Sequence, residues 1–480
     1  MLHPIVWFGF AVLIGYLLGA PPGGSYAIRI GKSLVGLAML FVLIRFPIHV
    51  GMGIFFILYA FPATISIGST NFIFIVLITV MWAVRVAMGN ERGIQRTCLD
   101  LAILLYISVH ILSLAAVSTN HDLTMSLKSL LHLSVPILMY YVIVNIGRVP
   151  GRLRFLAEMF TVGMLVVYFS GFMQRYASGV AWLPRWYVAG TGGQGMFGDS
   201  GAARVGGVFT HAMMADTAAF MAILQMYLAM YFKNRPWRRA LHWITAAVSI
   251  YMISLTANRG GLIIFLIGLT YFYVVFAGEL SWKRVVLGLT MVFIALAIGE
   301  LAQGGEGKVT LAARTIGTKV HGLVPDTRRG VWAYIWDRIM EKPILGHGPY
   351  FDVDTYDNAR RVFWPHNGYL YYFFTVGLVG LPAFLYLVVR VLSRTVVGWK
   401  MTIQEAPLSR GLTAVFHIGI VQFLIGQLRT DHQRGDPYVY FMWMLFAMGI
   451  LARQVWEDEK AAEVAKQLPA DTAAVRHAGA

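Results

Sequence analysis

The feature of the sequence that most limits its fold is a series of long apolar runs, which recur from one end of the chain to the other. Each run has about 17–25 residues, which is the length that an α-helix needs to cross the hydrocarbon core of a bilayer. Hydrophobic residues make up 58% of the 480 residues and charged residues only 13%, roughly half the charged fraction of a soluble domain. The runs are continuously apolar and do not alternate as the strands of a membrane β-barrel do. The sequence therefore predicts an all-α polytopic membrane protein.

From residue 70 onwards the runs are clearly separated, and each predicts one span. These spans are residues 70–86, 98–117, 127–145, 155–175, 208–232, 241–257, 262–278, 285–301, 367–390, 411–428 and 438–453. Residues 4–20 predict a further span rather than a removed signal peptide, because neither a basic leading segment nor a clear cleavage site accompanies them. Residues 33–62 form either one long kinked helix or two short helices that meet near Arg45, Pro47 and His49. The total is accordingly 13 or 14 spans.

Basic residues gather in five alternate loops of this series, and these five loops fall on one side of the membrane. The positive-inside rule assigns that side to the cytoplasm. This pattern accounts for the formal net charge of +16, which therefore does not indicate nucleic-acid binding. The single cysteine, Cys98, excludes an intramolecular disulfide and a cysteine metal cluster. The basic residues of the five loops are Arg85, Arg92 and Arg96; Arg148, Arg152 and Arg154; Lys233, Arg235, Arg238 and Arg239; Lys283 and Arg284; and Arg390, Arg394, Lys400 and Arg410.

The opposite, outer face carries the two longest loops, residues 176–207 and 302–366. The second of these contains a helix signal over Thr327–Met340. Its apolar stripe of Val331, Ile335 and Ile339, with Trp332 and Trp336, follows helical spacing. We expect this helix to lie on the membrane surface or to cover a cavity.

Arg259 stands at a tight junction between two apolar runs on this outer face. A charge left in hydrocarbon costs several kcal/mol, so this arginine either anchors to lipid headgroups or lines a site. The next residues, Gly260 and Gly261, carry no side chain and let other atoms approach the backbone. Arg204 is a second arginine beside glycines, ahead of the span 208–232. Two such guanidinium groups on one face match the oxygens of phosphate groups.

His366 ends the long outer loop at the start of the span 367–390. A histidine there is either a helix-end residue or a proton acceptor that works near neutral pH. The same loop supplies two cations, Arg328 and Arg329, and a glycine-rich turn over residues 343–348. These neighbours favour a site on the outer face.

Two other polar segments admit competing interpretations. Asp352, Asp354 and Asp357 offer oxygen ligands for a divalent cation, but short acidic runs are common in loops and we predict no metal site. The last outer loop, residues 429–437, shapes an acceptor site or is a solvated turn. Its candidate residues are Arg429, His432 and Arg434.

The order of these motifs resembles that of the O-antigen ligase and O-antigen polymerase superfamily. The resemblance runs from about residue 200 to 390 and rests on five short motifs. These are Arg204-x-x-Gly207, Asn258-Arg-Gly-Gly261, Arg328-Arg-Gly-x-Trp332, Pro343-Ile-Leu-Gly-x-Gly348 and His366-Asn-Gly-Tyr-Leu370. Each motif is weak alone, and together, in order and on one face, they are fairly specific. One position departs from the family, since its usual serine before Arg-Gly-Gly is Asn258 here.

The resemblance implies a fold similar to that of C-type membrane glycosyltransferases and an active site that faces the periplasm from the bacterial inner membrane. The donor would be a glycan on undecaprenyl diphosphate and the acceptor a hydroxyl group, in the assembly of lipopolysaccharide or exopolysaccharide. The reaction would invert the anomeric carbon and require neither a metal nor another cofactor. The implied diphosphate ligands are Arg204 and Arg259, with Arg328 or Arg329, and the implied base is His366. The supporting or acceptor residues would be Asn258, Asn367, Arg429, His432 and Arg434.

The implied layout has N-terminal spans in residues 1–175 and a catalytic region in residues 176–390, which includes the periplasmic loop 302–366. Residues 391–454 would hold the last spans and residues 455–480 a cytoplasmic tail. Lipid A core, a second glycan repeat and a protein side chain are the three candidate acceptors, and we expect a ligase or a polymerase. The rival from another class is a transporter or flippase of lipid-linked glycans, which would place ionisable groups near mid-bilayer on broken helices.

Overall fold

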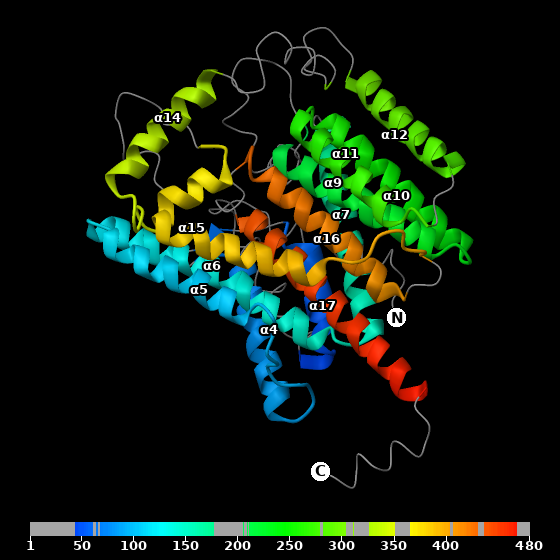
Figure 1. Cartoon of the computed structure of the whole chain (residues 1–480), viewed down its shortest axis with the longest axis horizontal. Coiled ribbons are helices and arrows are strands. Elements are labelled where there is room, and N and C mark those ends of the chain that lie inside the picture. Colours follow the sequence, from blue (N-terminus) through cyan, green and yellow to red (C-terminus); the bar gives the residue numbers. More distant parts are fainter. Residues whose placement is uncertain are drawn as a thin grey trace, which may run out of the picture.

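The computed structural model describes residues 44–60, 64–65, 68–176, 205, 209, 211–278, 282–303, 311, 326–350, 365–403, 407–430 and 436–467. Over these residues the chain is a bundle of α-helices (Figure 1), and the all-α prediction is confirmed. Two short strands, β1 (Thr64–Ile65) and β2 (Gly68–Ser69), form an antiparallel pair. The predicted span 4–20 lies outside the described residues.

Every predicted span beyond residue 70 corresponds to one helix. The helices are α3 Ile48–Leu58, α4 Thr70–Ala87, α5 Asp100–Ser113 with the 3-10 turn η1 Leu114–Ala116, α6 Asn120–Ile146, α7 Pro150–Tyr176, α9 His211–Tyr231, α10 Pro236–Leu255, α11 Arg259–Val275, α12 Trp282–Gln303, α14 Asp326–Glu341, α15 Gly368–Thr395, α16 Leu408–Gly426 and α17 Asp436–Gln467. Among the described residues, α4, α6, α7, α9, α15, α16 and α17 contain segments long and apolar enough to cross a bilayer. Shorter apolar helices are α3, α5, α11 and part of α12.

The helical conformation is interrupted at Phe46 and Pro47. Ile44 and Arg45 before them are helical, and α3 starts after them at Ile48. Proline lacks the backbone N–H that a continuous helix needs, which explains the break. From there α3 is buried between its neighbours α4 and α7. The interruption lies near Arg45 and Pro47, where the two-helix alternative has its helices meet. Residues 33–43 lie outside the described residues, so the choice between the two alternatives stays a prediction.

The loops that carry the basic residues contact one another at one end of the bundle. Arg148 donates two hydrogen bonds to Asp458, at 2.7 and 2.8 Å, and a third to Gln95. Arg390 donates to the carbonyl of Cys98, on the loop before α5. These contacts bring together the regions of Gln95, Arg148 and Arg390, as the predicted alternation of basic loops requires for these three. The cytoplasmic orientation of this end stays a prediction.

Helix α9 occupies the centre of one half of the bundle, against α10, α11 and α16. Every residue from Met213 through Ala229 is buried, which is expected of a helix that is apolar on all sides. Its alanines let neighbouring backbones approach closely, as small residues do in membrane bundles. A β-carbon placed on Gly261 of α11 would lie only 2.4 Å from the Ala215 side chain.

Helix α15 consists of two helical halves that meet at Gly377, whose φ of 64° and ψ of −165° are not helical. The segment 343–348 fills this break with four backbone hydrogen bonds. His347 and Gly348 donate to the carbonyls of Phe374 and Thr375, at 2.9 and 3.0 Å. Leu378 and Val379 donate to the carbonyls of Pro343 and Ile344, at 2.8 and 3.2 Å. The loop thus satisfies backbone groups that the interruption of the helix would leave without partners inside the bundle.

Glycine is required on both sides of this junction. Gly346 and Gly377 both have positive φ, at 68° and 64°. A β-carbon on Gly377 would lie 2.3 Å from the carbonyl oxygen of Ile344, and one on Gly346 would lie 2.6 Å from that of Phe374. The glycine-rich turn noted in the sequence therefore serves the close approach of two backbones.

The loop helix α14 packs against the first half of α15 (Figure 1). The predicted stripe faces α15, since Ile335 and Ile339 are buried with Tyr371 and Phe374. The centroids of the Trp336 and Phe373 rings lie 6.0 Å apart, and Trp336 is 49% exposed. The helix predicted in this loop is confirmed, and within the described residues it covers the half of α15 that starts beside His366.

Candidate functional site

The first part of the candidate site is the N-terminus of α11. Ala257 has a left-handed φ of 47°, which is uncommon for a residue other than glycine and turns the chain sharply after α10. Asn258 then caps α11, because its side-chain oxygen accepts a hydrogen bond from Gly261 N at 3.2 Å. Arg259 is the first residue of the helix and is half-buried. Asn258 therefore serves as the side-chain cap of α11.

The two glycines after Arg259 admit protein groups. A β-carbon on Gly260 would lie 2.2 Å from Cδ and 2.4 Å from Nε of Arg429. A β-carbon on Gly261 would collide with Ala215 of α9. The Gly-Gly pair is thus explained by an arginine and by a neighbouring helix that both lie directly against the start of α11.

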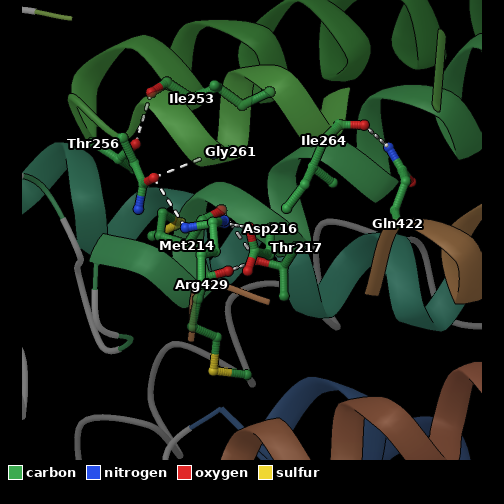
Figure 2. Close-up of polar contacts among 11 residues, drawn as sticks. Met214, Asp216, Thr217, Ile253, Thr256, Gly261, Ile264, Gln422 and Arg429 are labelled. Atoms are coloured by element: carbon green, nitrogen blue, oxygen red, sulfur yellow. Dashed lines mark hydrogen bonds and ion pairs between the residues drawn. The ribbon is translucent and has the colours of Figure 1, made fainter. Parts of the chain in front are cut away.

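Arg429 follows the C-terminus of α16 and links three elements. It forms an ion pair with Asp216 of α9 (Figure 2). Its Nη1 also donates to the Asn258 side-chain oxygen at 3.0 Å. The side chains of Arg429 and Asp216 are only 19% and 6% exposed. Burial lowers the pKa of Arg429 to about 10, so that the guanidinium stays charged at neutral pH and its carboxylate partner offsets part of the cost of burial.

The second part of the site is the N-terminus of α15. His366 is half-buried and also has a left-handed φ of 47°. Asn367 caps the helix by accepting hydrogen bonds from the backbone N–H groups of Tyr369 and Leu370, at 3.0 and 3.1 Å. The two helix starts are therefore built alike, each with a left-handed residue followed by an asparagine cap.

The last turn of α16 and the residues after it hold both helix starts. Gly368 N donates to the carbonyl of Gln427 at 2.7 Å, and Asn367 Nδ2 to that of Leu428 at 3.4 Å. Tyr369 Oη donates to the carbonyl of Leu424 at 3.0 Å. Because Arg429 in the same segment binds the cap of α11, the residues before Arg259 and after His366 share one support.

Loop helix α14 also contacts this region. Trp332 Nε1 donates to the carbonyl of Pro365, directly before His366, at 2.6 Å. The backbone of Val205 donates to the carbonyl of Leu255, near the end of α10, at 3.3 Å. The chain next to Arg204 therefore runs beside the junction that leads to Arg259.

The predicted site residues divide into three groups. Asn258, Arg259, His366, Asn367 and Arg429 lie at the two helix starts or on the segment that joins them. Arg328 and Arg329 belong to the first turn of α14. Arg204, His432 and Arg434 lie outside the described residues, as does the acidic run at residues 352–357.

Sequence reasoning missed two residues of this region. Asp216 is a carboxylate inside the apolar run 208–232, and an ionisable residue in such a run is itself a signal of a function. Gln427 is 1% exposed, and its side-chain amide has no hydrogen-bond partner in the described parts of the chain. In those same parts no group of three or more histidine, cysteine, aspartate or glutamate residues could hold a metal ion.

Residues 244–385 match the family model described as O-antigen ligase. The matched region runs from α10 into α15 and includes Asn258, Arg259, α14, His366 and Asn367. No curated protein matches the chain. The family indicates an enzyme of the O-antigen ligase type in surface polysaccharide assembly, with glycan substrates and a multi-pass membrane location. The match therefore supports the O-antigen ligase superfamily for residues 244–385 of the chain.

Proposed function

We propose that the protein transfers a glycan from undecaprenyl diphosphate to an acceptor hydroxyl group at the periplasmic face of the inner membrane. The observation that carries the proposal is the shared support of the two helix starts. The segment from Leu424 to Arg429 binds the caps beside Arg259 and His366. A cation and a candidate base, both in the part of the protein that matches the O-antigen ligase family, thus flank one segment that lies beyond the match.

The diphosphate of the donor is assigned to Arg259. The N-terminus of a helix carries partial positive charge and free N–H groups, and an arginine in its first turn adds a fork that fits phosphate oxygens. Arg204 is assigned as the second ligand. The hydrogen bond between Val205 and Leu255 supports this pairing, because it keeps the chain beside Arg204 next to the α10–α11 junction. Arg328 or Arg329 supplies a further cation from α14.

His366 is assigned as the base. It accepts the proton of the acceptor hydroxyl as that oxygen attacks the anomeric carbon. The bond between this carbon and the diphosphate oxygen breaks, and the electron pair leaves with the diphosphate, whose charge the arginines stabilise. Attack opposite to the leaving group inverts the anomeric configuration. Neutralisation by arginine lets the transfer proceed without a metal.

A flippase of lipid-linked glycans is the rival function, and the interrupted helix α15 is the observation that favours it. The interruption is occupied by the backbone of residues 343–348. The ionisable side chain of that segment, His347, is stacked on Phe374 and hydrogen-bonded to the Arg338 carbonyl. The break therefore serves internal packing, which favours the transferase.

Deletion of the gene, followed by gel analysis of lipopolysaccharide and capsule, tests the proposal. Loss of the polymer ladder on lipid A together with accumulation of carrier-linked polymer would assign a ligase. Attachment of single repeats would assign a polymerase. Unchanged surface glycans would contradict the proposal. Accumulation of carrier-linked glycan on the cytoplasmic side, which is the defect expected from loss of a flippase, would also contradict it.

A further inference from the structure

The ion pair between Asp216 and Arg429 has no part in the transfer chemistry proposed above, although it lies next to the helix that starts at Arg259. A buried ion pair adds little stability compared with apolar residues of similar size. The other buried polar residues of α9, Thr217 and Gln225, are uncharged, and most of the helix packs through small and apolar side chains such as Ala215 and Ala218. We therefore ask whether this charged pair orients a neighbouring group rather than adding stability.

The contacts of Arg429 show which groups the ion pair holds together. Asp216 holds one end of the guanidinium (Figure 2). Nη1 of Arg429 donates to the side-chain oxygen of the Asn258 cap at 3.0 Å. The stem of Arg429 lies against Gly260, where no side chain fits between the two. The backbone on both sides of Arg259 thus packs between α9 and the segment that follows α16.

The same segment fixes the start of α15 by backbone contacts that do not depend on side-chain charge. Gly368 N binds the Gln427 carbonyl at 2.7 Å, two residues before Arg429. A β-carbon on Gly368 would lie 1.8 Å from Gln427 Oε1, so that this contact leaves no space. Movement of Arg429 relative to Asn258 would consequently change the position of α11 relative to α15.

We propose that Asp216, acting through Arg429, is a positioning residue that sets the placement of Arg259 relative to His366. This inference rests on the proposed function, in which Arg259 binds the diphosphate and His366 is the base. Asp216 touches neither substrate nor reacting atoms in this scheme. Its carboxylate orients Arg429, Arg429 orients the cap of α11, and the cap orients Arg259.

The role predicts a specific kinetic pattern. Asp216→Asn retains the size of the side chain and removes the charge that fixes Arg429. Arg259 would still bind the donor, so the donor KM should stay within about threefold. Because misplacement by about 1 Å can cost roughly 100-fold in rate, kcat should fall by about 10- to 100-fold. Arg429→Lys, which keeps the charge but loses the fork that reaches both partners, should retain more activity than Arg429→Met.

Gln422→Met is the matched control. Gln422 is buried on α16, and its Nε2 donates to the Ile264 carbonyl of α11 at 3.1 Å (Figure 2). The substitution therefore removes a polar contact between α16 and α11 that lies away from the start of α11. It should leave kcat within about threefold of the wild type. Equal losses in Gln422→Met and Asp216→Asn would reduce the ion pair to a packing contact and overturn the inference.

Hydrogen–deuterium exchange provides a readout that does not require glycan transfer. The backbone amides of residues 258–262 should exchange faster in Asp216→Asn than in the wild type and in Gln422→Met. Unchanged exchange there would overturn the inference, even if Arg259→Ala abolishes transfer and so supports the proposed function. Faster exchange in Asp216→Asn, together with a wild-type protein that transfers no glycan, would instead support the positioning contact and reject the proposed function.

Discussion

Nη1 of Arg429 lies 3.0 Å from Oδ1 of Asn258. An arginine in the segment after α16 thus binds the residue that caps α11. The two residues are 171 positions apart in the chain. Asn258 uses the same oxygen to cap α11 through Gly261 N. One side-chain oxygen thus joins a helix start to a distant arginine, and the environment of Arg259 depends on both contacts.

Gly260→Ala should disrupt this arrangement. The added β-carbon would lie 2.2 Å from Arg429 Cδ, so that the arginine must move away from Asn258. We expect glycan transfer to fall by more than about 10-fold at unchanged membrane abundance, since small displacements near a reacting group are costly. Gly151→Ala is the control, because a β-carbon on this glycine of α7 meets nothing within 4 Å. Equal activity of the two variants would show that Arg429 has no effect on the reaction.

Arg259→Ala should lower transfer by about 100-fold or more, which is the usual effect of removing one group that stabilises a developing negative charge. His366→Ala should lower kcat by about 100- to 10,000-fold, as expected for loss of a general base. Turnover by purified protein with a lipid-diphosphate donor measures both effects. Wild-type turnover in Arg259→Ala would remove the diphosphate assignment, and wild-type turnover in His366→Ala would remove the base.

Trp332→Phe tests the cover provided by α14. The substitution keeps an aromatic ring and removes the hydrogen bond from Nε1 to the Pro365 carbonyl. A single hydrogen bond contributes about 1 kcal/mol, so we expect a decrease of about fivefold in kcat/KM. Trp336→Phe is the control, since that ring is 49% exposed and contacts α15 through Phe373. A larger loss in the control would place the function of α14 in its contact with α15 instead.

Gly377→Ala should destabilise the protein by more than about 3 kcal/mol. Its positive φ alone costs a residue with a side chain about 1–2 kcal/mol, and the β-carbon would also lie 2.3 Å from the Ile344 carbonyl oxygen. Gly89→Ala separates the two contributions, because Gly89 has a φ of 73° and open space around its β-carbon position. Unfolding by SDS in mixed micelles gives both values. Similar losses in the two variants would mean that the segment 343–348 does not constrain α15.

Helix positions could be predicted well from the sequence because hydrocarbon imposes one simple rule. A segment must be long and apolar enough to cross it, and its ends are marked by polar residues. The helix of the long outer loop was predictable from a different signal, the spacing of Val331, Ile335 and Ile339. Both signals are local, and local signals determine where helices begin and end.

The support of the site could not be predicted in this way because it depends on distant pairs. Asp216 and Arg429 are separated by 213 positions. Nothing in the apolar run around Asp216 or in the loop that begins at Arg429 indicates that they meet. The Gly-Gly pair indicated a close approach to the backbone of α11, but not that the approaching group is Arg429. The interruption of α15 was missed for the same reason, since glycine alone does not break a membrane helix and the partner segment lies 30 residues earlier in the chain.

The junction at Gly377 also determines how this protein could be recombined with its relatives. Residues 343–348 belong to the long outer loop by sequence, but their hydrogen bonds run to α15 as far as Val379. Lys342 and Pro349 extend the same attachment to α5 and α6, through the Ala116 carbonyl and the Ser129 hydroxyl. A chimaera that exchanges the loop should therefore be joined beyond Val379 rather than at His366. The earlier boundary would place residues 343–348 and their hydrogen-bond partners in α15 in segments from different proteins.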